Sequence, residues 1–183
     1  MDEQAKKHVA ESLLDCGSIQ FDAERGWKLK IHDTHPRAPR SPFYIDLRIL
    51  RSFPRILDEV AYLMALLVEE SQLNVDVVSD VPTAATPIVT LVSKKMDTPM
   101  ISPRLDAKAH GLEREIDGVW RPGQTVAVID DLRTTGGSKE EVIKLFQKKG
   151  LVPVGVWVVV DRGAEEGAPV AGLPFHTLYR WSE

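Results

Sequence analysis

The sequence predicts an α/β fold in which a central, mainly parallel sheet is covered by helices on both faces. Segments with strand and helix patterns alternate along the chain up to residue 160, and this order requires right-handed crossovers between parallel strands. The strand of residues 154–160 is an almost unbroken β-branched run, as expected when helices bury both faces of a sheet. A length of 183 residues fits one domain with a substantial core. The whole chain, residues 1–183, is therefore expected to form a single domain.

Two amphipathic helices are expected in the first half of the chain. Apolar residues recur at helical spacing in residues 5–14, ahead of Gly17, and a stronger stripe occupies residues 56–67 after Pro54. Spacings of three and four residues place these side chains on one face of each helix. Core packing accounts for both stripes.

The second half supplies most of the sheet. Apolar runs bounded by glycine or proline predict strands, and amphipathic stretches between them predict helices. The expected order is strand 75–79, helix 86–95, strand 100–103, strand 125–129, helix 138–149 ended by Gly150, and strand 154–160.

One polar stretch interrupts this alternation. Residues 104–118, RLDAKAHGLEREIDG, contain two glycines and show neither the helical nor the strand period. A long irregular segment inside a compact domain is usually functional, so we expect a mobile functional loop here. A solvated charged excursion is the alternative.

Composition and charge exclude several classes of protein. The chain is 43% hydrophobic and 27% charged, with a formal net charge of −4, which is typical of a globular protein and unsuited to coating a nucleic-acid backbone or an anionic membrane. Cys16 is the only cysteine, so an intrachain disulfide framework is ruled out. No segment approaches the length of a membrane span, and no leader peptide is recognisable. We expect a cytoplasmic protein with neither a nucleic-acid nor a membrane partner.

The stretch AVIDDLRTTGGSKEE, residues 127–141, has the features of an anion-binding turn. Asp130 and Asp131 follow the expected strand 125–129, and ligands of such sheets bind at the carboxyl ends of the strands. Ser138 and Glu141 have the spacing of a capping box at a helix start. Backbone N–H groups of the glycine turn and of the first helical turn would therefore face an anion.

The two acids before this turn favour a sugar phosphate as the ligand. Carboxylates accept hydrogen bonds from paired ribose hydroxyls, while glycine lets the backbone wrap a phosphate closely. Other phosphate-loop patterns, GxxxxGK[ST] and GxGxxG, are absent. A charged strand-to-helix loop without any ligand is the alternative.

Residues 126–138, VAVIDDLRTTGGS, resemble the signature of the type I phosphoribosyltransferases, which bind 5-phosphoribosyl 1-diphosphate (PRPP) and join its ribose to a nitrogenous base. Four further segments resemble the orotate branch of that family: SPFYIDLR (41–48), DVVSDVPTAATP (76–87), RLDAKAHG (104–111) and VVVDRG (158–163). The resemblance implies orotate phosphoribosyltransferase activity, a glycosyl transfer in pyrimidine nucleotide biosynthesis. It also implies the type I phosphoribosyltransferase fold with a small hood region at residues 1–50 that contributes to base binding.

The resemblance assigns roles to particular residues. Lys108, His110 and Asp131 would be catalytic, and loop 104–118 would close over the reaction centre. The implied PRPP-binding residues are Thr83, Ala84, Arg104, Lys108, His110, Asp130, Asp131, Thr134, Thr135, Gly136, Gly137 and Ser138. The implied base-binding residues are Lys30, Tyr44, Thr134 and Arg162. Core packing is the alternative for Tyr44.

A cation and a partner subunit also follow from the resemblance. Mg²⁺ would be held through PRPP near Asp130 and Asp131, with no direct protein cage. Loop 104–118 would be shared between the subunits of a homodimer.

Several positions depart from the family pattern. Residues 31–40, IHDTHPRAPR, are longer than the family's short basic turn, Leu105 replaces a lysine, and Asp80 and Ala85 stand where glycine is common. An acid beside a diphosphate is unfavourable, so Asp80 either binds metal or points away. The departures keep two alternatives open: transfer to another nucleobase, and a regulator that binds PRPP or a nucleotide without turnover.

Overall fold

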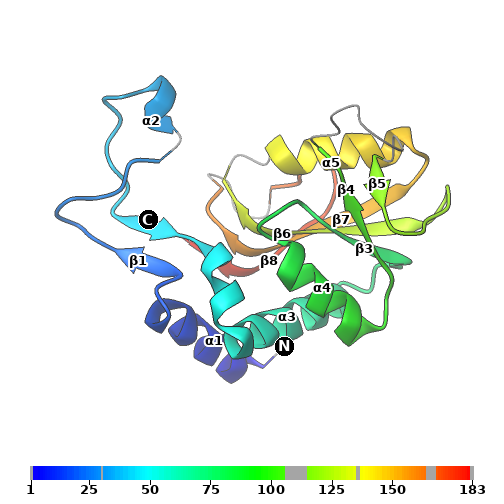
Figure 1. Cartoon of the computed structure of the whole chain (residues 1–183), viewed down its shortest axis with the longest axis horizontal. Helices are drawn as coiled ribbons and strands as arrows, with labels where there is room; N and C mark the ends of the chain where they lie inside the picture. Colours follow the sequence, from blue (N-terminus) through cyan, green and yellow to red (C-terminus); the bar gives the residue numbers. More distant parts are fainter. Residues whose placement is uncertain (1, 30, 106–114, 135–136, 164–167, 182–183) are drawn as a thin grey trace. The chain divides into compact units, whose positions relative to one another are not determined.

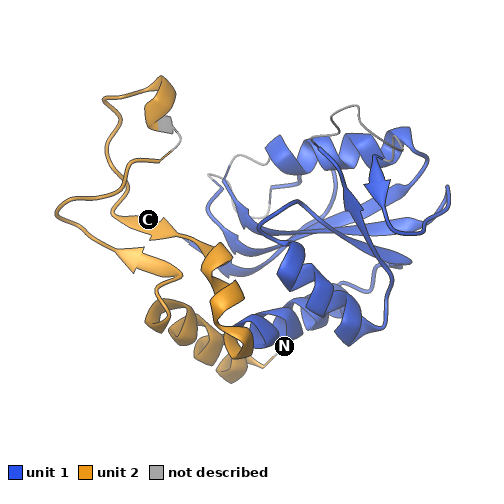
Figure 2. Ribbon diagram, viewed as in Figure 1, with its two compact units in different colours: residues 1, 57–183 blue, residues 2–56 orange. Residues whose placement is uncertain are grey.

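The computed structural model describes residues 2–29, 31–105, 115–134, 137–163 and 168–181. The chain divides into two compact units, residues 2–56 and residues 57–183 (Figure 2).

The larger unit contains a six-stranded sheet with the strand order β5-β4-β3-β6-β7-β8. All of its strand pairs are parallel except the pair of β5 and β4 at one edge. Its elements in chain order are α3 (Pro54–Glu70, which begins just before the boundary), β3 (Val77–Asp80), α4 (Thr86–Met96), β4 (Met100–Pro103), β5 (Ile116–Asp117), β6 (Thr125–Arg133), α5 (Gly137–Lys148), β7 (Val152–Asp161) and β8 (Phe175–Arg180).

Helices cover both faces of this sheet. Helix α5 contacts β6 and β7, and α4 contacts β3, β4 and β6; Figure 1 shows the two helices on opposite sides. Val142, Ile143 and Phe146 of α5 are buried against Val126 and Val128 of β6. The predicted fold class, a mainly parallel sheet between helices, is confirmed.

Strand β6 is longer than its apolar run. We expected it to end at residue 129 with the two acids in a following loop, and this boundary was wrong. Pairing with β7 continues from Asp130, opposite Val158, to Arg133, opposite Asp161. The ten-residue β7 offers backbone partners beyond the apolar stretch, so the acids belong to the strand.

Helix α5 also begins one residue earlier than expected. Its first residue is Gly137, so Ser138 lies inside the first turn instead of capping it. The predicted helix 86–95 and strand 100–103 agree with α4 and β4 to within one residue.

The smaller unit is built around a two-stranded antiparallel sheet. Strands β1 (Ile19–Phe21) and β2 (Phe43–Ile45) pair with Ile19 opposite Ile45. Helix α1 (Glu3–Asp15) begins at an Asp2 cap, whose carboxylate accepts the Gln4 N–H at 2.9 Å. Along the chain, the short helix α2 (Ile31–Thr34) comes between β1 and β2, and the 3₁₀ helix η1 (Leu47–Ser52) follows β2.

Candidate active site

Predicted ligand residues follow four neighbouring parallel strands of the larger unit. Thr83 and Ala84 come after β3, Arg104 after β4, Thr134 after β6 and Arg162 after β7. These strands are adjacent in the order β4-β3-β6-β7, so their carboxyl ends meet at one edge of the sheet. This edge is where ligands of α/β sheets bind.

Asp130 is buried and paired with a lysine that the sequence analysis missed. Only 5% of Asp130 is exposed; its Oδ1 accepts the Asp131 N–H at 2.8 Å. The Lys139 Nζ, in the first turn of α5, lies 2.5 Å from its Oδ2 and donates to the Leu132 carbonyl at 2.8 Å. Lys139 is 2% exposed, so the pair joins β6 to α5 inside the protein. In the sequence, the only signal for this pair is a lysine at the start of a predicted helix that follows two acids.

Asp131 has an unusual ionisation. Burial of its carboxyl, together with the neighbouring charge of Asp130, raises its pKa to about 7, because both effects disfavour the ionised form. The Lys139 ammonium opposes this shift. The Asp131 carboxyl therefore keeps its proton to a higher pH than an ordinary aspartate does, which brings proton exchange closer to neutral pH.

The described part of the glycine turn is open. Thr134, Gly137 and Ser138 are exposed, and a carbon added to Gly137 would meet no described part of the protein within 4 Å. Thr135 and Gly136 lie outside the described residues. On its described flanks the turn therefore has room for a ligand group.

The unexpected acid at the end of β3 is turned into the protein. Asp80 is fully buried, and its carboxylate accepts hydrogen bonds from the hydroxyls of Thr86 and Ser102. Its charge therefore does not face the edge where a diphosphate would bind. Thr83 in the following loop is exposed and Ala84 is half-buried.

Arg104 lies exposed at the end of β4. Its Nε donates to Asp117 of β5 at 2.8 Å, and this pairing raises the arginine pKa further above its usual range. Leu105 beside it is 41% exposed. The predicted catalytic residues Lys108 and His110 fall outside the described residues.

A buried ion pair joins the ends of β6 and β7. Arg133 donates from Nε and Nη2 to the two oxygens of Asp161, both at 2.7 Å, and Arg180 of β8 pairs with the same carboxylate. Burial opposes ionisation of Asp161, but hydrogen bonds from Arg133, the Gly163 N–H and Arg180 outweigh it and lower its pKa. The Arg162 N–H donates to the Arg133 carbonyl at 2.8 Å.

Arg133 and Asp161 were not predicted as functional residues, although both belong to the segments that resemble the family. The signal was a charged residue beside a predicted ligand residue in each segment. Neither position revealed its partner, because the two residues are 28 positions apart in the chain.

Comparison with known proteins identifies the family. No family model matches the chain. The orotate phosphoribosyltransferase of Pyrococcus horikoshii is 35% identical over 180 residues, which cover 97% of this chain and 92% of that protein. The chain belongs to the orotate phosphoribosyltransferase family.

Two longer proteins resemble this member of the orotate phosphoribosyltransferase family. The uridine 5'-monophosphate synthase of Bos taurus is 36% identical over 140 residues, which cover 75% of this chain and 29% of that protein. The solved structure of UMP synthase from Leishmania donovani has a TM-score of 0.78 at 32% identity and covers 98% of this chain and 36% of that chain. This chain therefore spans about a third of the length of each of these proteins.

Two further predicted base-binding residues, Tyr44 and Lys30, belong to the smaller unit. Tyr44 is half-buried and stacks on Trp27 with ring centroids 6.3 Å apart. Its hydroxyl accepts from Arg48 Nη2 at 3.3 Å. Lys30 lies outside the described residues. Base binding by Tyr44 and Lys30 stays a prediction.

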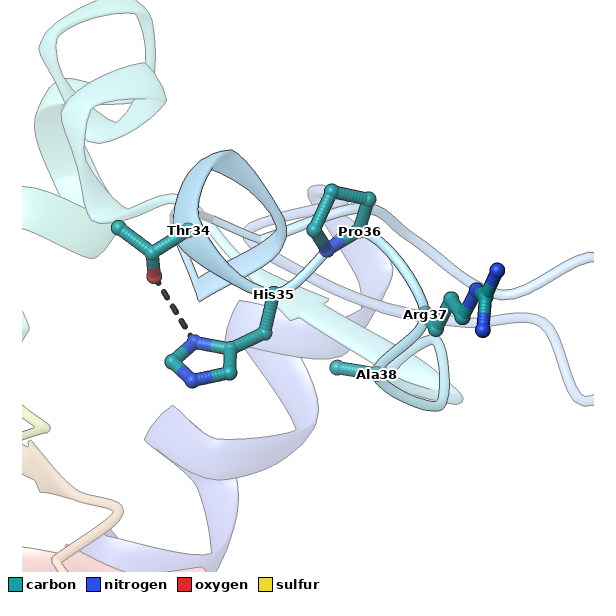
Figure 3. A pocket seen from close by; sticks show the side chains of 5 residues that line it. All are labelled: Thr34, His35, Pro36, Arg37 and Ala38. Carbon is teal, nitrogen blue, oxygen red and sulfur yellow. Dashed lines mark hydrogen bonds between the residues drawn. The ribbon is translucent and has the colours of Figure 1, made fainter.

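Histidines of the segment 31–40 are engaged by their own loop. His32 Nδ1 accepts the Leu29 N–H at 2.9 Å and its Nε2 lies 3.2 Å from the Ala38 carbonyl, so both ring nitrogens are occupied. His35 bonds to Thr34 at 2.9 Å beside a cavity of about 550 Å³ lined by residues 34–38 (Figure 3). Among the residues that the structure describes, no group of three or more His, Cys, Asp and Glu side chains could hold a metal.

Within the described ranges, no helix combines the length and the apolar character needed to cross a bilayer.

Proposed function

We propose that this chain transfers the 5-phosphoribosyl group of PRPP to orotate, giving orotidine 5'-phosphate and diphosphate. The observation that carries the proposal is the placement of predicted ligand residues after four adjacent parallel strands. Membership of the orotate phosphoribosyltransferase family supports the same reaction.

The phosphoribosyl group would bind at β6 and the turn that follows it. The Asp131 carboxyl can accept ribose hydroxyls. Asp130, whose oxygens already bond to the Asp131 N–H and to Lys139, would offer only the lone pairs that these bonds leave free. Thr134, Thr135, Gly136, Gly137 and Ser138 would surround the 5'-phosphate with hydroxyls and N–H groups at the start of α5. Thr83 and Ala84, after β3, would contact the diphosphate.

Bond breaking requires charge stabilisation at two places. As the bond from the anomeric carbon to the diphosphate oxygen breaks, positive charge develops on the ribose, and the leaving group takes the electron pair. The Asp131 carboxylate would face the ribose, while Arg104, Lys108 and His110 would face the diphosphate. The ring nitrogen of orotate then forms the new bond to the anomeric carbon, and its proton passes to the departing diphosphate or to water.

The donor set around Asp131 fits Mg²⁺ held mainly by substrate oxygens. Mg²⁺ usually takes one or two carboxylates together with phosphate oxygens and water. Asp130 is already paired with Lys139, so Asp131 is the carboxylate that would be available to the cation. When bound, Mg²⁺ would neutralise charge that develops on the diphosphate.

Orotate would bind between Thr134 and Arg162. A guanidinium can hold a carboxylate through two parallel hydrogen bonds, which suits Arg162 to the carboxylate of orotate. Lys30 and Tyr44 are the other two residues proposed to bind the base.

The proposal includes a homodimer in which loop 104–118 serves the partner's site. It also places the enzyme in the cytoplasm, since Cys16 is a free thiol and free thiols persist in reducing compartments.

Diphosphate release tests the proposed reaction. The purified chain is incubated with PRPP, Mg²⁺ and one of orotate, uracil, hypoxanthine or adenine. We expect diphosphate to be released with orotate and not with any of the other three bases. Turnover only with another base would instead identify a different phosphoribosyltransferase. Binding of PRPP without turnover on any base would identify a regulator. Leu105, which replaces a lysine of the family pattern, would then account for the missing activity.

A further inference from the structure

The bidentate ion pair of Arg133 and Asp161 lies directly beside both predicted base-binding residues of the larger unit. Arg133 and Asp161 are opposite partners in the pairing of β6 with β7. Thr134 immediately follows Arg133, and Arg162 immediately follows Asp161. The side-chain bond between Arg133 and Asp161 therefore fixes the backbone positions from which Thr134 and Arg162 extend.

We propose that Arg133 is a positioning residue of the base site. Its bond to Asp161 fixes the separation between Thr134 and Arg162 and so sets the affinity for the acidic base. The inference rests on the proposed function, since it deepens the role of that same site. Arg133 acts through its neighbours and does not itself touch orotate.

The surroundings of the Arg133 guanidinium hold it in place from several sides. Only 5% of Arg133 is exposed. Its Nη1 donates to the Ala168 carbonyl at 2.8 Å, and its Cζ lies 3.7 Å from the centre of the Phe175 ring. All of these partners belong to the protein, so the Arg133 side chain holds the strand ends together.

Backbone bonds transmit this order to Arg162. The Arg162 N–H donates to the Arg133 carbonyl at 2.8 Å, and the Gly163 N–H donates to Asp161 Oδ1 at 2.7 Å. Both residues that flank the Arg162 side chain in the sequence are thus tied to the ion pair. A shift of the guanidinium moves the backbone that carries Arg162.

The geometry of the pair requires arginine. Two parallel bonds fix both distance and orientation, whereas the lysine ammonium is a point charge on a flexible stem. An Arg133→Lys substitution therefore keeps the charge and loses the orientation. Small displacements of a positioned group have large effects on ligand binding.

Gly163 offers an independent way to disturb the same guanidinium. A carbon added at Gly163 would lie 2.9 Å from Arg133 Cζ, Nε and Nη2, which is too close for contact. Gly163→Ala would therefore displace Arg133 without changing any charge.

The experiment measures KM for orotate and KM for PRPP in the full-length Arg133→Lys and Gly163→Ala proteins. We expect KM for orotate to rise about tenfold in Arg133→Lys and less in Gly163→Ala, and KM for PRPP to rise by a smaller factor in each, because Thr134 is only one of several residues proposed to bind PRPP. Lys95→Met is the matched control, because it removes the 2.8 Å pair with Asp58 between α3 and α4, away from the sheet edge. Its melting temperature should fall while both KM values stay unchanged.

KM does not depend on the fraction of folded enzyme, so loss of stability alone cannot imitate the expected result. An unchanged KM for orotate, or an equal rise of both KM values, would overturn the positioning role. If Arg133→Lys does not fold, Gly163→Ala decides the question. Absence of orotate turnover in the wild-type protein would instead refute the proposed function itself.

Discussion

Asp131 shows how one residue can be costly for folding and useful for chemistry. Its pKa of about 7 results from burial and from the adjacent Asp130 charge. A carboxyl with such a pKa exchanges a proton near neutral pH, and strongly shifted groups of this kind gather at functional sites. The residue was selected from the sequence as a ligand of ribose hydroxyls, but its shifted pKa depends on burial that only the fold provides.

The stability of the ligand-free protein should reveal the raised pKa. Between about pH 4 and pH 7 the folded state keeps a proton that the unfolded state has lost, so this carboxyl makes the folded state less stable as pH rises through that range. Asp131→Asn removes the ionisable group. We expect its melting temperature to exceed that of the wild type by several degrees at about pH 8 and by less at about pH 5.

Asp76→Asn is the control of opposite sign. Hydrogen bonds from the Thr125 N–H and hydroxyl lower the pKa of Asp76, so its ionisation favours the folded state above the usual carboxyl pKa. Its replacement should lower the melting temperature at about pH 8. Equal melting curves of Asp131→Asn and the wild type at both pH values would contradict a raised Asp131 pKa.

Strand β6 and helix α5 are held together by charge as well as by apolar packing. The Asp130 carboxylate and the Lys139 ammonium are both buried, and each has a second partner, the Asp131 N–H and the Leu132 carbonyl. Buried charges are tolerated when they are paired in this way, and removal of one partner leaves the other uncompensated. The start of α5, with the proposed phosphate turn, therefore depends on this pair.

Lys139→Met should destabilise the protein strongly, since it leaves Asp130 buried and unpaired. We expect the free energy of unfolding, measured in urea, to fall by about 3–5 kcal/mol. The double variant Lys139→Met with Asp130→Asn has no buried charge at this place and should recover much of the loss. A double variant as unstable as Lys139→Met alone would show that the pair is not what holds the two elements together.

The elements with strong periodic patterns could be predicted from the sequence, while polar and short ones could not. Helix α4 and strand β4 were predicted to within one residue because their apolar patterns and flanking residues are local signals. The last residues of β6, Asp130 to Arg133, have low strand propensity, and their state follows from pairing with β7. Strand β8 and the short strands β1, β2 and β5 were not predicted at all. Strand β5 (Ile116–Asp117) pairs with β4 inside the segment 104–118, which was expected to be an irregular loop to its end.

The same division applies to the candidate site. Asp130, Asp131 and Thr134 form a continuous local pattern, so they could be selected without a structure. Lys139 and Arg133 belong to the same stretch, but their importance depends on ion pairs that form only after folding. Pairing partners on different elements leave no local pattern to detect.

At the scale of the whole molecule, the proposed active site requires more than one chain. The larger unit supplies the ends of four strands, while Lys108 and His110 belong to loop 104–118, which we propose is shared within a homodimer. Complementation between inactive subunits tests this arrangement directly.

Mixing Lys108→Ala and Asp131→Asn chains should restore activity. In a heterodimer with shared sites, one site receives both substitutions and the other receives neither, so an equimolar mixture should show about a quarter of wild-type activity. Each variant alone is expected to be nearly inactive. The mixture is prepared by unfolding and refolding the two chains together, with heterodimer formation verified by distinct affinity tags. Verified heterodimers without activity would show that each site uses the loop of its own chain.

The extension of β6 through both acids has a consequence for ligand binding. Since Asp130 and Asp131 lie within β6, which pairs with β7 at Asp130 and again at Leu132, the backbone entropy of ordering them is lost when the chain folds and not when a sugar phosphate arrives. The carboxylates are preorganised, and less of the binding free energy is spent on immobilising them.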